Sequence, residues 1–172
     1  ARALATRLRQ AGEFDEAVVL AGGVTLWGAC VAQTLVTCSA PSDTAGTVTV
    51  RGNSTALRSL RLSGARPGVW ASGARYSVAL RDVEVAGARF FGIVAWNGAH
   101  VTLDDVVVRD TLPRTDGKSG RGLDVELGGT VELRRAAFER NLDAAIYASG
   151  AGSTVTAEDL VVRDTDAEQA DH

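Results

Sequence analysis

The chain has 172 residues, of which 45% are hydrophobic and 23% are charged, and its formal net charge is −3. This length suits a single domain over residues 1–172. The composition excludes an acidic disordered tail, a collagen-like polymer and a strongly basic nucleic-acid-binding protein, and the short apolar runs exclude a membrane-spanning helix.

The first predicted element is a short amphipathic helix over residues 1–12, with Leu4 and Leu8 on one face. Such a helix would cap the open edge and the hydrophobic interior at the first coil of a repeat protein. Short apolar segments then predict irregular first coils over residues 17–56, and a loop that contains proline interrupts them at residues 39–46. We therefore expect a capping helix followed by short strands.

The two cysteines of the chain, Cys30 and Cys38, lie within this irregular region. Their spacing does not suit a zinc knuckle, and no second pair of cysteines or histidines lies nearby to complete four ligands. Two alternatives stay open: a local disulfide, which would indicate an oxidising compartment, or two buried thiols. His100 is a lone histidine at the start of a predicted strand, which favours a surface position. We expect no bound metal and no cofactor.

A repeat organises residues 57–165. Four segments share the pattern apolar–x–apolar, two polar residues, apolar–x–apolar, and they begin at Val78, Val101, Val131 and Val155. A third short strand follows each copy, and a glycine or another small residue then turns the chain. Three short strands per repeat with bends between them are typical of a β-solenoid. The prediction is an all-β, right-handed parallel β-helix (β-solenoid) of about six coils with an N-terminal capping helix.

The repeat also predicts which residues become neighbours in successive coils. Equivalent positions are Leu60, Val83, Val106, Ala136 and Leu160, at separations of 23, 23, 30 and 24 residues. The 30-residue copy carries its extra residues in an inserted loop over residues 112–120. Stacking makes equivalent outward residues neighbours. One outward column of charged residues reads Arg58, Arg81, Asp104, Arg134 and Glu158, and its sign alternates from Arg81 onward. We expect such residues to form ladder pairs of about 0.2–1 kcal/mol each rather than catalytic groups.

The third strand of each copy carries the candidate ligand-binding residues. Two outward columns run through it, and they read Trp70, Val94, Asp124, Tyr147 and, two residues on, Ser72, Trp96, Glu126, Ser149. Aromatic rings stack on the C–H groups of a sugar while carboxylates accept hydrogen bonds from its hydroxyl groups. Inserted loops on a rigid scaffold often carry function. The expected binding residues are Trp70, Trp96, Asp124, Glu126, Tyr147, Lys118 and Arg121.

Other interpretations of this face stay open. Outward aromatic residues can instead cover a neighbouring coil, pack under the loop or meet a partner domain. Asp124 and Glu126 lie on one face of a strand, about 6.6 Å apart by strand rise, which is loosely compatible with the acid/base pair of a glycosidase. The same two carboxylates can also simply pair with Arg121, Arg134 or Arg135.

With these residues in view, the sequence resembles a known group. The segment from Gly22 to Cys30, preceded by Leu4 and followed by the repeat from Leu60 to Val162, is similar to right-handed parallel β-helix repeat proteins of the pectate-lyase-like superfamily. More narrowly, it resembles uncharacterised cell-envelope or secreted bacterial members. The resemblance implies contact with carbohydrate. The acidic clusters that lyases and hydrolases of that superfamily use are not assembled on one face of this sequence.

These observations predict a non-catalytic, secreted or cell-envelope β-helix domain that acts as a scaffold or as a glycan- or protein-binding module. Its expected partner is a polysaccharide or another cell-surface protein, and not a nucleic acid. The alternative is a polysaccharide lyase or glycoside hydrolase that uses Asp124 and Glu126 beside the 112–120 loop. A self-associating structural element is a third interpretation. The polar tail over residues 166–172 carries no obvious cap, which indicates a partner or further coils in a longer chain.

Overall fold

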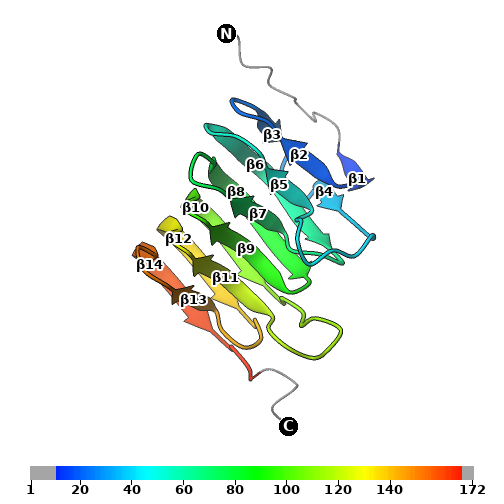
Figure 1. Cartoon of the computed structure of the whole chain (residues 1–172). Coiled ribbons are helices and arrows are strands. Elements are labelled where there is room, and N and C mark those ends of the chain that lie inside the picture. Colours follow the sequence, from blue (N-terminus) through cyan, green and yellow to red (C-terminus); the bar gives the residue numbers. More distant parts are fainter. Residues whose placement is uncertain (1–10, 168–172) are drawn as a thin grey trace.

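A computed structural model of the chain describes residues 11–167. Over these residues the secondary structure consists of strands and turns, with no helix (Figure 1). The predicted capping helix over residues 1–12 falls almost entirely on residues 1–10, which lie outside the described residues, and Gly12 at its end begins a strand. The strands are β1 (Gly12–Asp15), β2 (Val18–Leu20), β3 (Thr25–Trp27), β4 (Thr34–Thr37), β5 (Val48–Val50), β6 (Thr55–Gly64), β7 (Val69–Ser72), β8 (Ser77–Ala88), β9 (Phe91–Trp96), β10 (His100–Arg109), β11 (Arg121–Glu126), β12 (Thr130–Glu139), β13 (Ile146–Ser149) and β14 (Thr154–Arg163).

The described strands form two parallel sheets. In sheet A the order is β1-β4-β6-β8-β10-β12-β14, and β3 also pairs with β6; in sheet B the order is β2-β5-β7-β9-β11-β13. The chain alternates between the sheets, so each long strand of sheet A and the sheet B strand that follows it form one layer of a stack (Figure 1). All pairings between the named strands are parallel. Parallel all-β sheets stacked in chain order confirm the coarse fold prediction and fit a parallel β-helix.

Each long strand of sheet A turns a corner at one residue with a positive φ angle. These residues are Ser59 (51°), Asp82 (53°), Asp105 (55°), Arg135 (48°) and Asp159 (55°). The left-handed conformation is costly for most residues other than glycine, although aspartate tolerates it better than most. Successive layers repeat it at the same place, so the corner belongs to the fold and is not a local irregularity. We call the part of a strand before this residue its first arm and the part after it its second arm.

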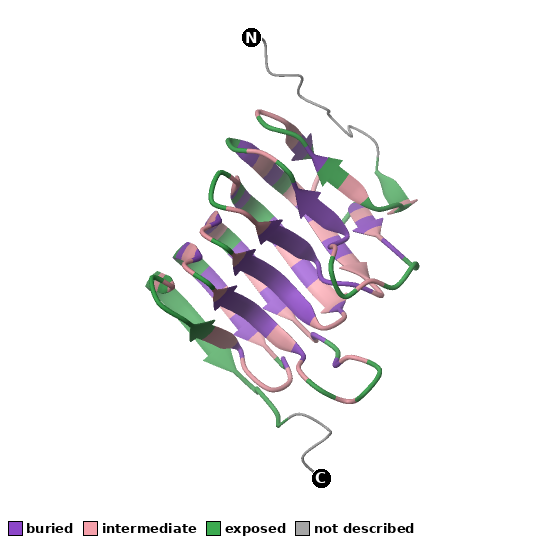
Figure 2. Ribbon diagram, viewed as in Figure 1, coloured by how far each residue is buried: buried purple, intermediate pink, exposed green. Residues whose placement is uncertain are grey.

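Strand pairing confirms the predicted repeat register. Leu60 pairs with Val83, Val83 with Val106, Val106 with Ala136, and Ala136 with Leu160. The core is a stack of Val, Leu, Ile and Ala side chains between the sheets, seen in Figure 2 as buried bands on every inner strand. Because period-2 alternation points every second side chain inward, aliphatic residues in phase from layer to layer suffice to build it.

The last layer leaves its core-facing side uncovered. Leu160 and Val162 of β14 are 37% and 49% exposed, whereas their partners in β12, Ala136 and Phe138, are 2% and 0% exposed. Figure 2 shows β14 as exposed along almost its whole length. Within the described part of the chain β14 pairs with β12 alone, so one edge of its backbone has no strand partner.

The irregular first coils predicted for residues 17–56 consist of the short strands β2 to β5 and the start of β6. The 39–46 loop lies between β4 and β5, as its proline suggests. Cys30 is half-buried and Cys38 is buried, and both are free.

A buried polar network lies where the second arms end. The side chain of Asn141 is fully buried, and its Oδ1 accepts hydrogen bonds from the hydroxyl and the backbone N–H of Thr111, at 2.7 and 3.3 Å. Its Nδ2 donates to the carbonyl of Val108 at 3.1 Å. The amide is thus paired at both ends, as a buried polar group requires.

Candidate functional site

The two predicted columns on the outer face of sheet B are present. Trp70, Val94, Asp124 and Tyr147 are partners in successive strands, and so are Ser72, Trp96, Glu126 and Ser149. The outward direction of the first column is also confirmed, because Trp70 and Val94 belong to an apolar cluster separate from the core between the sheets. The sequence therefore predicted correctly which side chains of sheet B are neighbours.

The central residues of this face are nevertheless buried. Trp70 is 8% exposed and Asp124 has no exposed surface. The rings of Trp70 and Trp96 meet edge to face with centroids 4.9 Å apart, and Phe91 meets Trp96 in the same way at 5.7 Å. Because these rings cover one another, Trp70 offers no platform to a sugar.

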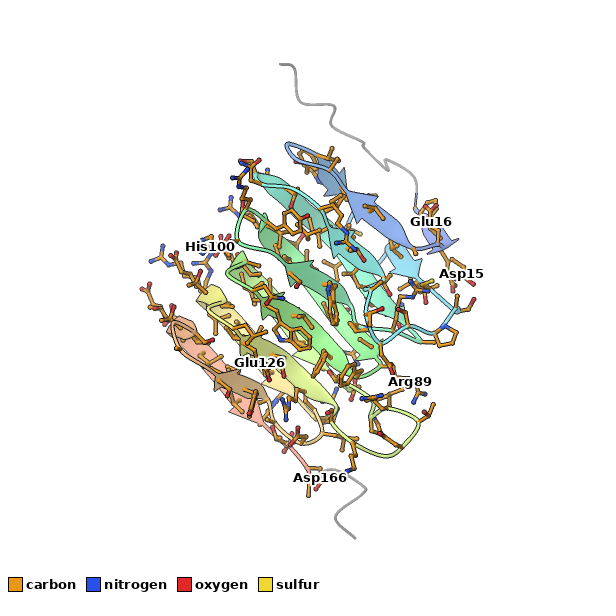
Figure 3. All side chains as sticks on the ribbon, in the orientation of Figure 1. Asp15, Glu16, Arg89, His100, Glu126 and Asp166 are labelled. Atoms are coloured by element: carbon orange, nitrogen blue, oxygen red, sulfur yellow. The ribbon has the colours of Figure 1, made fainter. Side chains whose placement is uncertain are left out.

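Two loops help to close the face. In the 112–120 loop, Arg114 pairs with Asp43 of the 39–46 loop at 3.1 Å, and its guanidinium carbon lies 4.9 Å from the ring centroid of Phe90. Arg89, at the end of β8, donates to the carbonyl of Pro113 at 2.8 Å (Figure 3). The inserted loop therefore packs on the molecule beside Phe90. Lys118 is exposed on this loop.

Arg121 contacts three other side chains of this face. Its Nη1 donates to Oδ2 of Asp124 at 2.8 Å, its Nε to Oδ2 of Asp143 at 2.5 Å, and its guanidinium carbon lies 3.7 Å from the ring centroid of Tyr147. Burial alone would lower the pKa of Arg121, but its hydrogen bonds to Asp124 and Asp143 outweigh this effect and raise the pKa. The other oxygen of Asp124 accepts from Nε1 of Trp96 at 2.6 Å.

Glu126 is the half-buried acid of this group, labelled in Figure 3 on sheet B. Its Oε1 lies 3.8 Å from Nη1 of Arg121. Burial and the neighbouring charge of Asp124 raise the pKa of Glu126, against the opposing charge of Arg121. The two carboxylates thus differ: Asp124 is enclosed and paired, whereas Glu126 keeps part of its surface in solvent.

The described residues were also searched for metal-binding groups and for membrane-spanning helices. Among residues 11–167 no group of three or more histidine, cysteine, aspartate or glutamate side chains is placed to hold a metal ion. That part of the chain also contains no helix of the length and apolarity needed to cross a membrane.

A second surface lies on the outer side of the first arms of sheet A, and we call it the first-arm face. Strand pairing defines two adjacent columns on it. They read Trp27, Arg58, Arg81, Asp104, Arg134, Glu158 and Thr25, Ala56, Ala79, Thr102, Glu132, Thr156. Two of the predicted ladder pairs are confirmed here, since Arg81 pairs with Asp104 at 3.0 Å and Arg134 with Glu158 at 2.7 Å, whereas Arg58 lies beside the like charge of Arg81.

The first-arm face is hollowed over β8 to β14. The hollow has a volume of about 480 Å³ and is lined by Arg81, Thr102, Leu103, Asp104, Glu132, Leu133, Arg134, Thr156 and Glu158. Its volume is within the range of small-ligand sites in proteins. Arg135 at the adjacent corner also pairs with Asp104, and its hydrogen bond holds the pKa of Asp105 below the ordinary value.

Trp27 stands at the N-terminal end of the same face. It is 40% exposed, and the guanidinium carbon of Arg58 lies 5.7 Å from its ring centroid. Trp27 is not among the binding residues predicted from the sequence, because the first coils show no clear copy of the repeat. Aligning residues 25–27 with residues 56–58 would have identified it. In that register Trp27 pairs with Arg58 and is the first member of the charged column.

No family model, curated protein or solved structure matches this chain.

Proposed function

We propose that this chain is a non-catalytic binding scaffold and that its first-arm face binds carbohydrate. The observation that carries the proposal is the hollow of about 480 Å³ on this face, in line with the exposed ring of Trp27. A rigid stack of parallel strands supports the hollow from below, so that its lining changes little on binding.

The chemistry of the face suits a sugar polymer. The exposed indole of Trp27 offers an apolar surface for C–H groups. The hydroxyl groups of Thr102 and Thr156 can both donate and accept, as sugar hydroxyls do. Layers repeat about every 4.8 Å across the strands, so equivalent groups recur along the direction in which an extended polymer would lie. The partner is accordingly a polysaccharide or a glycosylated surface protein.

The test is a glycan array, followed by calorimetric titration of any polysaccharide that binds. Trp27→Ala is expected to weaken binding by about tenfold, because it removes a stacked ring. Thr102→Ala is expected to weaken it less, by loss of one hydroxyl. Leu127→Ala is the control, since Leu127 is an exposed apolar residue (59%, against 40% for Trp27) in the turn after β11 and away from the first-arm face.

Two results would overturn this proposal. One is an array on which no glycan binds. The other is a titration in which Trp27→Ala and Leu127→Ala bind with the wild-type affinity, which would leave the first-arm face without a role.

We also infer a right-handed parallel β-helix of about six coils related to the pectate-lyase-like superfamily. The parallel stacked sheets and the repeat register support this inference. A secreted or cell-envelope location accords with a polysaccharide ligand and is tested by fractionating cells that produce the protein. A crystal structure tests the handedness and the number of coils.

A second candidate function is cleavage of a polysaccharide by Asp124 and Glu126. The raised pKa of Glu126 favours it, because a general acid must be protonated near its working pH. Its weakness is Asp124, which is fully buried and hydrogen-bonded to Trp96 and Arg121. This function is supported if the wild type releases reducing ends from a polysaccharide and Glu126→Gln does not. It is contradicted if the wild type releases no product.

A further inference from the structure

We infer that the first-arm face selects a polysaccharide that carries both acidic and basic groups, with an acidic group bound by Arg58 and Arg81 and a basic group bound by Glu132. The inference rests on the carbohydrate binding proposed above and specifies the charge of the ligand. It is argued from charged side chains of this face that the molecule itself does not neutralise.

Arg58 and Arg81 are neighbouring like charges. They are paired residues of β6 and β8, in a column whose sign alternates only from Arg81 onward. Like charges directly opposite each other on neighbouring strands are destabilising. None of the ion pairs within residues 11–167 includes Arg58, which instead lies against the ring of Trp27. The charge of Arg58 is therefore not compensated by a carboxylate of this part of the chain.

The carboxylate of Asp104, which pairs with Arg81, is shared. Asp104 lies 3.0 Å from Arg81 and also pairs with Arg135 at the corner. Asp82, which follows Arg81 in the sequence, forms no ion pair with Arg58 or Arg81. An anionic group of a ligand, placed between the two stacked arginines, would remove their repulsion and accept hydrogen bonds from both.

The two arginines are accessible to such a group. The side chain of Arg81 is 63% exposed, and Arg58 is exposed as well. The column beside them holds Ala56 and Ala79, whose side chains are too short to cover a guanidinium group. Because neighbouring layers lie about 4.8 Å apart, one carboxylate, sulfate or phosphate group can contact both guanidinium groups.

Glu132 provides the opposite charge inside the hollow. It is exposed, lines the hollow and stands between Thr102 and Thr156 in its column. No ion pair within the described residues includes it. Arg134, two residues further along the strand, donates both Nε and Nη2 to Glu158, at 3.0 and 2.7 Å. The carboxylate of Glu132 can therefore accept hydrogen bonds from an ammonium group of a ligand.

The order of the strands determines the spacing of the two positions. Arg58, Arg81 and Glu132 belong to β6, β8 and β12, and β10 lies between β8 and β12 (Figure 1). Glu132 is thus two layers from Arg81 and three from Arg58, which is about 10–14 Å across the strands. A polymer that crosses the layers would meet the two arginines, then the hydroxyl group of Thr102, then Glu132.

Matched polymers isolate the effect of each charge. Hyaluronan carries a carboxylate in every repeating unit, N-deacetylated hyaluronan carries a free amine as well, and dextran is neutral. Calorimetric titration at low salt, where surface charges are least screened, measures the dissociation constant of each polymer. N-deacetylated hyaluronan is expected to bind about tenfold more tightly than hyaluronan, and dextran is expected to bind most weakly.

Two variants separate the two positions. Arg58→Gln is expected to weaken the binding of both charged polymers about tenfold, because one of the two guanidinium groups is lost. Glu132→Gln is expected to weaken the binding of N-deacetylated hyaluronan alone. Arg75→Gln and Glu16→Gln remove the same charges at exposed residues in the turns after β7 and β1, and they are the controls. Thermal unfolding followed by circular dichroism verifies that every variant folds.

The outcomes distinguish this inference from the proposed function. If dextran binds as tightly as the charged polymers, or if Arg58→Gln binds them with the wild-type affinity, selection by charge is wrong while carbohydrate binding stands. If Glu132→Gln weakens the binding of both charged polymers equally, the basic group is not bound by Glu132 and the inference is overturned. If no polymer binds in the titrations and no glycan binds on the array, both the inference and the proposed function fail.

Discussion

The indole Nε1 of Trp96 donates a hydrogen bond of 2.6 Å to Oδ1 of Asp124, a carboxylate with no exposed surface. The two residues belong to neighbouring strands, β9 and β11, and Arg121 holds the second oxygen of Asp124 at 2.8 Å. This arrangement joins the aromatic cluster on sheet B to the ion pairs beside it. Trp96 and Asp124 therefore satisfy each other within this face, whereas the first-arm face carries an exposed tryptophan, Trp27.

We predict that Asp124→Ala lowers the free energy of unfolding by about 3 kcal/mol, because it leaves the partly buried Arg121 without its fully buried partner and Trp96 without an acceptor. Urea denaturation measures this change. Asp143→Ala is the control: it removes the other, partly solvated partner of Arg121 and should cost clearly less. Equal losses in the two variants would contradict a central role for Asp124.

We predict that Glu126→Gln changes the dependence of stability on pH. The pKa of Glu126 is raised above its ordinary value of 4.5 by burial and by the charge of Asp124. The folded state therefore holds its proton more tightly than the unfolded state, and the free energy of unfolding falls as the pH rises from 4.5 through the raised pKa. Glu126→Gln removes this fall.

Urea denaturation over a pH series checks this, with Glu132→Gln as a control at an exposed glutamate on sheet A. If Glu126→Gln and wild type lose stability in parallel as the pH rises, the burial of Glu126 has no effect on its titration.

We predict that Gly92→Ala destabilises the protein by about 1–3 kcal/mol through overpacking. A Cβ at Gly92 would lie 2.4 Å from the backbone oxygen of Gly122 and 2.4 Å from Cγ1 of Val108. Gly22→Ala is the control, because its nearest atoms, both of Asn53, lie at 3.4 Å. Thermal unfolding of the two variants should separate them clearly, and equal midpoints would show that the layers can move apart at Gly92.

The register of the fold could be predicted because two patterns agree on it. Leu60, Val83 and Val106 recur in phase, and the same phase puts Arg81 beside Asp104. A slip of one residue would turn every inward side chain outward. Local sequence therefore contains enough information to stack the layers.

The closure of the sheet B face could not be predicted in the same way. Beside it, Asp43 and Arg114 meet through two loops that have no repeat to align them. Period-2 alternation says that Trp70 points outward, but not that Trp96 and Phe91 cover it. Whether an outward side chain is buried depends on the residues that pack on the outer face of the sheet. The alternation along a strand gives the direction of a side chain but contains no information about those residues.

The ion pair between Asp43 and Arg114 connects an early part of the stack to a middle one. In a protein whose layers touch only their immediate neighbours, unfolding can begin at an end and proceed one layer at a time. A link that passes over the strands between β5 and β11 opposes this, because the layers that it joins cannot separate without breaking it. Opening of the early layers should therefore cost slightly more free energy than their strand pairing alone requires, by the small contribution of one half-exposed ion pair.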